Sequence, residues 1–218
     1  MTANLLRGKA DPDALADLVR RLEPDVVALQ ELGAAQASAV AGLVPFGLLL
    51  PDAPDRLGLA VRRPATVRRL PLPGRGALVT DLPLADGTDV EVINLHAIAP
   101  HTPPLWASIW SRRRQLRALL DHLDATARSR RVLLGDLNAT PLWPFYRRLG
   151  GRFEDAASLA ARTQGRRPER TWGPWPGAPR LLRIDHVLVT GLAVARCRVE
   201  ALPGSDHAAL VADLAVVA

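Results

Sequence analysis

Carboxylate, amide and imidazole side chains recur inside or just after short apolar runs of this chain. The runs are VVALQE, INLHAIAP, LLGDLNATP, RIDHVLV and GSDHAAL, and together with the start of the chain they supply Asn4, Glu31, Asn94, His96, Asp136, Asn138, Asp185, Asp206 and His207. Because a strand delivers its end residue to one rim of a sheet, these runs could together build one site. Isolated acids and imidazoles are costly in apolar surroundings, whereas a cluster around a divalent cation is not. The pattern therefore predicts a site for a metal and a phosphate.

Two of the runs carry polar residues two positions apart, which puts both side chains on one face of a strand. In LLGDLNATP, the Asp136 carboxylate could bind a metal or orient a water, and the Asn138 amide could donate to a phosphate oxygen. The alternative is an Asx turn that ends the strand. Asn94 and His96 have the same spacing, and a single histidine after a strand is often only structural.

The last two runs contain adjacent Asp and His residues, whose side chains activate water when a carboxylate orients an imidazole and the free ring nitrogen takes a proton. Asp185 and His186 point to opposite faces of one strand, so only one of them can face a given site. Asp185 could orient the ring of His207, which would then be the base, and the alternative for either run is a structural role. Glu31 ends a buried run, where it either caps the next helix or binds a cation.

The segments between these runs predict an α/β layered fold. Asp11 and Pro12 open a helix that ends before Pro24, and a small-residue helix follows at residues 34–44. Between residues 46 and 95, short β-rich runs are separated by Pro, Gly and Asp-Gly turns, which is typical of antiparallel strands. Further strands are expected at residues 25–31, 132–138, 184–189, 192–201 and 208–217.

A long helix is expected from residue 105 to about residue 128. Its predicted buried side consists of Trp106, Ile109, Trp110, Leu116, Leu119, Leu120 and Leu123. Arg112, Arg113 and Arg114 are expected on the solvated face, as is His122, which stands between two aspartates.

The composition, with 48% hydrophobic and 23% charged residues among 218, is typical of a globular chain. No apolar run reaches the roughly 18–20 residues of a membrane span. The first residues lack the pattern of a signal peptide, so we expect a cytoplasmic protein, or a membrane-associated or extracytoplasmic one if the natural start lies upstream. Cys197 is the only cysteine, which excludes an intramolecular disulfide and a cysteine zinc cluster, and we expect no disulfide-linked partner. The net charge of +6 fits arginine-rich codon usage as well as attraction to phosphates.

Taken in order, the runs resemble the endonuclease/exonuclease/phosphatase superfamily, which has the DNase-I-like fold. The resemblance extends from TANLLRGKADPDALADLVRRLEPDVVALQEL to SDHAALVADLAV, and GDLNATP, RIDHVLV and SDHAALVADL are its most specific parts. It implies one domain over residues 1–218, built as a four-layer, two-sheet α/β sandwich. It also implies a hydrolase that cleaves phosphoester bonds with Mg²⁺ or Mn²⁺.

The resemblance further implies a role for each polar residue. Glu31 would be the principal metal ligand, helped by Asn4 and Asp206. Asp136 would position the attacking water, and Asn138 would hold a phosphate oxygen. His207, paired with Asp185, would be the base or a phosphate contact, and His96 would stabilise the transition-state charge or protonate the leaving oxygen. The segment LGLAVRRP at residues 57–64 does not contain the acidic partner that some nucleases of this family give to the histidine matching His96.

The expected substrate is a phosphodiester, in nucleic acid, anionic lipid or another molecule. A nuclease would use basic groove residues, for which the arginines at residues 162–170 and 180–183 are candidates, and Trp172 and Trp175 could stack a base or line a lipid or sugar pocket. The alternatives are a phosphomonoesterase acting on a sugar or inositol phosphate and a non-catalytic binding module of the same fold. A zinc hydrolase is disfavoured because no HExxH spacing is present.

Overall fold

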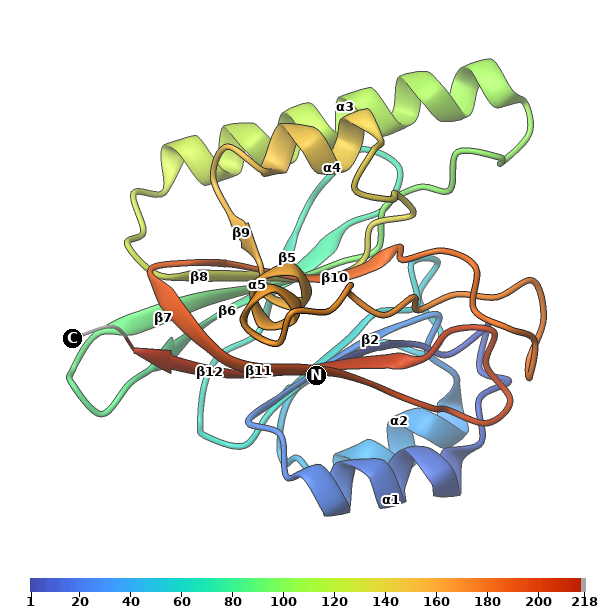
Figure 1. Cartoon of the computed structure of the whole chain (residues 1–218). Helices are drawn as coiled ribbons and strands as arrows, with labels where there is room; N and C mark the ends of the chain where they lie inside the picture. The colour runs from blue at the N-terminus through green and yellow to red at the C-terminus, as the bar shows by residue number, and fades with distance from the viewer. Residues whose placement is uncertain (217–218) are drawn as a thin grey trace.

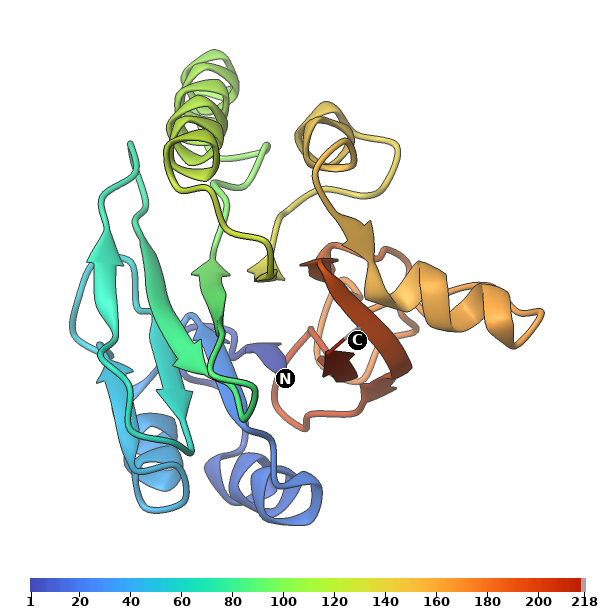
Figure 2. The same ribbon diagram turned by 90° about the vertical axis from the view of Figure 1, so that its left-hand side faces the viewer.

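In the computed structural model, which describes residues 1–216, two six-stranded sheets pack face to face between helices. Helices α1 (Pro12–Leu22) and α2 (Ala34–Ala41) cover one outer face, and α3 (Leu105–Ala125) and α4 (Pro144–Leu149) cover the other (Figure 1). Helix α5 (Ala156–Thr163) lies at one side of the sheets, as the rotated view in Figure 2 shows. This arrangement confirms the predicted four-layer, two-sheet α/β sandwich. That residues 1–218 form one domain remains a prediction.

The first sheet has the strand order β11-β12-β1-β2-β4-β3. Its strands are β1 (Thr2–Asn4), β2 (Val26–Gln30), β3 (Phe46–Leu49), β4 (Gly58–Val61), β11 (Leu192–Glu200) and β12 (Ala209–Val216). The second sheet has the order β5-β6-β7-β8-β10-β9. Its strands are β5 (Arg68–Leu70), β6 (Ala77–Pro83), β7 (Asp89–Leu95), β8 (Arg131–Asp136), β9 (Glu154–Asp155) and β10 (Asp185–Thr190).

Apolar side chains fill three layers between these elements. One cluster joins the first sheet to α1 and α2, a second joins the other sheet to α3 and α4, and a third lies between the sheets around Leu59, Leu78 and Leu134. Burial of these apolar side chains drives the packing of the layers. Residues at the ends of each helix or strand determine where it begins. At α1 the Asp11 carboxylate accepts hydrogen bonds from the N–H groups of Asp13 and Ala14, which confirms the predicted cap.

Strand direction brings the polar strand ends to a single rim. β1 runs parallel to β2 in one sheet, and β7 runs parallel to β8 in the other. β10 is antiparallel to β8 with Asp185 opposite Asp136, so β10 begins where β8 ends. β12 is likewise antiparallel to β1. A hydrogen bond of 3.0 Å from Asn4 Nδ2 to Asp136 Oδ2 joins the two sheets at this rim.

The long helix differs from its prediction in the direction of several side chains. Trp106, Ile109 and Trp110, predicted on the buried side, are exposed, whereas Arg112, predicted to be solvated, is buried. The apolar spacing i, i+3, i+4 marks a stripe on a helix but does not say whether another layer covers it. The N-terminal end of α3 extends past α4 (Figure 1), so this part of the stripe has no cover.

His122 was also predicted to be solvated, and this was wrong. Its Nε2 lies 3.1 Å from the buried carboxylate of Glu91, which also accepts a hydrogen bond from Arg131. Helix α5 and strand β9 were not predicted from the sequence. Within residues 1–216, no helix combines the length and the hydropathy that crossing a membrane requires.

Candidate active site

A cavity of about 260 Å³ opens at the rim where the polar strand ends meet. Seven of the eight residues predicted for the site line it: Asn4, Glu31, His96, Asp136, Asn138, Asp206 and His207. The eighth, Asp185, is fully buried and lies against the His207 ring, on the side away from the cavity lining. The structure thus brings together residues from both sheets that are separated by up to two hundred positions in the chain.

Asp136, at the end of β8, is held by two amides. Its Oδ2 accepts hydrogen bonds from Asn4 Nδ2 at 3.0 Å and from Asn138 Nδ2 at 3.1 Å, and its Oδ1 accepts from the Asn138 N–H at 2.8 Å. Burial raises the pKa of Asp136 to about 7, against the opposing charge of His207. A carboxyl group with this pKa can exchange a proton near neutral pH.

Gly135 allows β8 to approach β7 beside this carboxylate. Its φ of +137° is a conformation that residues with a side chain rarely adopt, and a Cβ atom at this position would collide with the carbonyl group of Leu95. The glycine therefore lets Asp136 and His96, the residue after Leu95, lie close together. His96 Nε2 is 3.6 Å from Asp136 Oδ2.

Asn138 uses its side-chain amide within the protein. Besides the bond to Asp136, its Nδ2 donates to the carbonyl of Ala97 at 3.0 Å, so both N–H groups have partners. Its φ of +45° turns the chain at the end of β8. In this arrangement Asn138 positions Asp136, and a contact with a phosphate oxygen would replace one of the two bonds.

His207 is oriented by Asp185. Its Nδ1 lies 2.9 Å from Asp185 Oδ2, which leaves Nε2 toward the cavity, 3.9 Å from Asp136 Oδ2. Burial disfavours a charged ring, but the charge and hydrogen bond of Asp185 raise the pKa of His207 to about 9. The Ser205 hydroxyl accepts the His207 N–H and donates to the carbonyl of Asn4, which ties the start of β12 to the end of β1.

His96 has an arginine as its close neighbour, which the sequence did not indicate. Nη1 of Arg75 lies 2.9 Å from Nδ1 and 2.7 Å from Nε2 of the ring. Burial first, and then the charges of Arg75 and His207, lower the pKa of His96 well below its usual value of 6.5. A neutral imidazole here can donate a hydrogen bond through its one N–H, but without the second proton of an imidazolium it is a poor general acid.

Glu31 and Asp206 each supply carboxylate oxygens to the cavity. Glu31 has a φ of +53°, and its Oε1 is 3.9 Å from His96 Nε2. Asp206 Oδ2 accepts a hydrogen bond of 3.0 Å from the Trp172 indole, whereas its Oδ1 is buried and has no hydrogen-bond partner in the described part of the chain. An unpartnered buried carboxylate oxygen is costly unless a cation or a substrate group meets it.

These donors fit a hard divalent cation, which prefers oxygen ligands. A compact donor set is formed by Asp136, Asp185 and His207, which each offer one atom within 4.8 Å of the others. Two of those three residues already bond to each other, however, so their nitrogen and oxygen atoms are largely committed. The oxygen-rich set with Glu31 and Asp206 is the better match to the chemistry of the ion.

The sequence did not predict the contacts that two helix residues make with the loops beside the cavity. Arg112 donates to the carbonyls of Ile98 and, at 3.2 Å, of Asn138, and so fixes the loops after β7 and β8. Gln115 Nε2 donates to the Arg75 carbonyl at 2.9 Å. Both residues lie on α3, where their helical spacing gave no sign of a contact with loops on another element.

Asn94 and His186, which stand beside predicted site residues, do not line the cavity. Asn94 accepts a 2.7 Å hydrogen bond from Gln30 and donates to carbonyls of β2 and β4, so it connects the sheets. His186 points away from the cavity, and its Nδ1 lies 3.2 Å from Asp155. His101, which the sequence left without a role, lines the cavity from the loop before α3.

Solved structures with the same fold span nearly the whole chain. An endonuclease/exonuclease/phosphatase from Beutenbergia cavernae is 22% identical, with a TM-score of 0.71 over 99% of this chain and 70% of that one. A humanized D. rerio TDP2 is 17% identical, with a TM-score of 0.77 over 98% and 96% of the two chains. A mannosyl-6-phosphatase from Bacteroides thetaiotaomicron is 16% identical, with a TM-score of 0.66 over 95% and 91%. These likenesses establish the fold.

A comparison with curated protein sequences finds no match. The sequence profile described as "Endonuclease/Exonuclease/phosphatase family" matches residues 1–207, which includes every residue that lines the cavity. The chain therefore belongs to the endonuclease/exonuclease/phosphatase family, whose members are hydrolases that act on phosphoester bonds.

Proposed function

We propose that the chain is a divalent-metal-dependent phosphodiesterase whose reaction takes place in the rim cavity. The observation that carries the proposal is the convergence of the Glu31, Asp136 and Asp206 carboxylates with two imidazoles around one cavity. His96, Asp136 and His207 are buried there and Glu31 and Asp206 are partly buried, and one carboxylate oxygen, Asp206 Oδ1, has no hydrogen-bond partner among residues 1–216, which is unusual for a purely structural cluster.

Glu31, Asp206 and Asn4 would hold the cation, which we propose to be Mg²⁺ or Mn²⁺. Bound there, the ion would act as a Lewis acid that neutralises charge on a phosphate oxygen. Asn4 would contribute a lone pair of Oδ1, the atom that also accepts the N–H of Leu6 at 3.0 Å, while its Nδ2 holds Asp136.

Asp136 and His207 would orient the attacking water and exchange protons with the reacting oxygens. Asp136, fixed by two amides, would orient the water that attacks phosphorus, and the attack forms one P–O bond as the ester P–O bond breaks. Because Asp185 occupies Nδ1 of His207, only Nε2 is available to exchange a proton with a reacting oxygen or to contact it. Neutral His96 would donate a hydrogen bond to a phosphate oxygen, a role that fits its arginine neighbour better than proton donation does.

Two recesses that adjoin the cavity through different lining residues support a diester over a monoester. One recess, of about 240 Å³, shares Arg7, Glu31, Arg75 and His96 with the cavity and continues to residues 54–56. The other, also of about 240 Å³, shares Pro100 and Trp143 with it. A phosphate between two recesses can carry a substituent in each, which is what a diester requires.

The test is hydrolysis of bis-p-nitrophenyl phosphate and of p-nitrophenyl phosphate, first in EDTA and then with Mg²⁺ or Mn²⁺ restored. We expect metal-stimulated hydrolysis, faster for the diester, and loss of that stimulation by at least about a hundredfold in Glu31→Gln, because a metal ligand is removed at nearly constant shape. Circular dichroism checks that the variant is folded.

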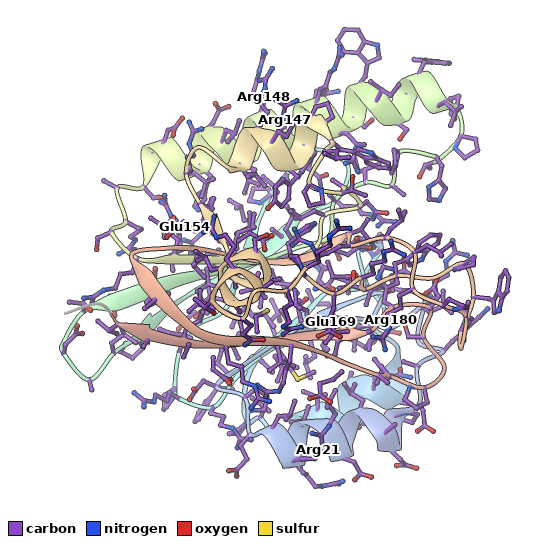
Figure 3. The ribbon with its side chains drawn as sticks, in the orientation of Figure 1. Arg21, Arg147, Arg148, Glu154, Glu169 and Arg180 are labelled. Atoms are coloured by element: carbon purple, nitrogen blue, oxygen red, sulfur yellow. The ribbon has the colours of Figure 1, made fainter. Side chains whose placement is uncertain are left out.

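Glu154→Gln is the matched control, since Glu154 is an exposed residue of β9 away from the cavity (Figure 3). It should leave the metal response unchanged. Equal activity of wild type and Glu31→Gln would refute the metal role of Glu31. Hydrolysis that is indifferent to EDTA would refute the proposed cofactor.

A further inference from the structure

Large apolar side chains are exposed on one face of the molecule. Six of the ten such residues within the described part of the chain come from two short segments: Leu105, Trp106, Ile109, Trp110, Leu142 and Trp143. Trp106 is 69% exposed, Trp110 60% and Leu142 84%. We call these six residues the apolar face. Singly exposed apolar residues are ordinary, but a contiguous group marks an interaction surface.

The two segments meet in space beside the candidate active site. Ile109 and Trp143 line the same recess, together with Pro100, Leu116, Pro144 and Phe145, and Arg112 lies over the Phe145 ring at 4.9 Å. Because Pro100 and Trp143 also line the cavity, the apolar face continues directly into the candidate active site.

The charge around this face has one sign. Residues 97–120 and 137–153 contain no aspartate or glutamate, but they contain seven arginines, of which Arg112 is buried and Arg152 is paired with Asp124. The other five are Arg113, Arg114, Arg117, Arg147 and Arg148. Arg113 and Arg117 follow Trp106 and Trp110 on one helical stripe, and the Arg113 guanidinium lies 5.5 Å from the Trp110 ring. Arg147 and Arg148 on α4 are exposed beside α3 (Figure 3).

The combination of tryptophan, aliphatic and arginine side chains indicates which kind of partner fits the apolar face. A single-stranded nucleic acid would use the tryptophans for stacking, but Leu105, Ile109 and Leu142 offer bases no flat surface. Tryptophan and aliphatic side chains bordered by arginine, without carboxylates, are typical of segments that enter the interface of an anionic bilayer. Arginine stems can lie along the hydrocarbon while their charged ends contact lipid phosphates.

We propose that the apolar face docks on an anionic lipid bilayer and presents the phosphodiester of a phospholipid headgroup to the adjoining cavity. Docking itself requires no turnover, whereas the choice of substrate rests on the proposed function. The recess between Ile109, Trp143 and Phe145 would receive an apolar part of the lipid.

The test is cosedimentation with vesicles of phosphatidylcholine alone and of phosphatidylcholine mixed with phosphatidylglycerol, in EDTA so that no lipid is cleaved. We expect binding to the mixed vesicles that weakens as salt is added, and at least about tenfold weaker binding for Trp106→Ala. The matched control is Trp175→Ala. Trp175 was a candidate for a lipid pocket, but it lines neither the cavity nor the two adjoining recesses, and its exposure of 63% is similar, so this variant should bind as wild type.

Charge is tested with Arg113→Glu/Arg117→Glu against Arg20→Glu/Arg21→Glu. The second pair makes the same change of net charge on α1, in the opposite helical layer, where Figure 3 labels Arg21. Only the first pair should abolish binding to anionic vesicles. Equal losses in both pairs would mean that net charge alone attracts the protein, and would overturn the assigned face.

Hydrolysis separates this inference from the proposed function. If bis-p-nitrophenyl phosphate is cleaved but the protein binds no vesicle, the docking proposal fails and the phosphodiesterase stands. If vesicles bind through Trp106 but neither the soluble ester nor phosphatidylglycerol is cleaved, docking stands and the phosphodiesterase fails. If Trp106→Ala weakens binding of a single-stranded oligonucleotide and leaves vesicle binding unchanged, the face belongs to nucleic acid and the lipid proposal is overturned.

Discussion

Two buried Asp–His pairs lie on opposite faces of β10, and they differ in the way expected between the proposed reactive site and a structural pair. Asp185 pairs with His207 on the side of the cavity, at 2.9 Å, and the next residue, His186, pairs with Asp155 on the other side, at 3.2 Å. Both pairs are buried, and both join residues that are far apart in the chain. The distance within a pair therefore does not identify which one can do chemistry.

The second nitrogen of each ring makes the distinction. His186 Nε2 lies 2.8 Å from the carbonyl of Ala139, so both ring nitrogens are occupied. Asp155 is equally committed, because its Oδ2 also accepts hydrogen bonds from Tyr146 at 3.0 Å and Arg183 at 2.6 Å. Among residues 1–216, no group lies at hydrogen-bond distance from His207 Nε2, which faces the cavity. A site for chemistry is recognised by the atoms that the fold leaves unpaired.

The difference between the two pairs is tested most directly by replacing each histidine in turn. His207→Ala should lower kcat for the diester by about 10²–10⁴-fold, because a positioned proton-transfer group is lost, with little change in the free energy of unfolding. Steady-state kinetics at saturating Mg²⁺ measure the effect. A change in KM alone would show that His207 only contacts substrate.

His186→Ala is the matched control and should reduce stability instead of activity. We expect kcat to stay within a few-fold of wild type, while the free energy of unfolding falls by about 1–3 kcal/mol because the Ala139 carbonyl loses its partner. A collapse of kcat in this variant, in protein shown to be folded, would mean that the two pairs do not differ in the way proposed here.

Asp155→Asn tests the structural pair by changing its aspartate. The substitution leaves the Arg183 guanidinium buried without its carboxylate, which should lower the free energy of unfolding by about 3–5 kcal/mol in urea titrations. Asp124→Asn removes an exposed ion pair with Arg152 and should cost at most about 1 kcal/mol. Similar losses in the two variants would contradict the assignment of Asp155 as a structural hub.

The smallest effect should appear in the pH dependence of stability. Burial alone would raise the pKa of Asp155, but the His186 hydrogen bond and the Arg183 charge hold it well below its usual value of 3.8. A carboxyl group with a depressed pKa stabilises the folded state above its unfolded pKa, and this stabilisation is lost as the pH falls further. The difference in unfolding free energy between wild type and Asp155→Asn should therefore shrink below about pH 4. A difference that stays constant in acid would contradict the depressed pKa.

Local patterns were sufficient to predict much of the layout. The Asp11–Pro12 cap, the buried strand before Glu31 and the strand that ends at Asp136 are all present, because capping and strand alternation depend on neighbours in sequence. The opposite orientation of Asp185 and His186 was predicted for the same reason. The joint occurrence of the polar strand ends indicated which residues line the cavity, although their roles stay predictions.

Tertiary structure decided which polar atoms are paired, because partners come from distant segments. Nothing near His96 in sequence indicated Arg75, and nothing near Ser205 indicated its bond to Asn4, two hundred residues away. The spacing of Trp106 and Trp110 predicted a stripe but not its exposure, which depends on where α4 ends above the sheet. Sequence thus determined what each element is and which face its side chains share. The packing of one layer on another determined what those faces meet, and so which imidazole, carboxylate and tryptophan remain free to meet something else.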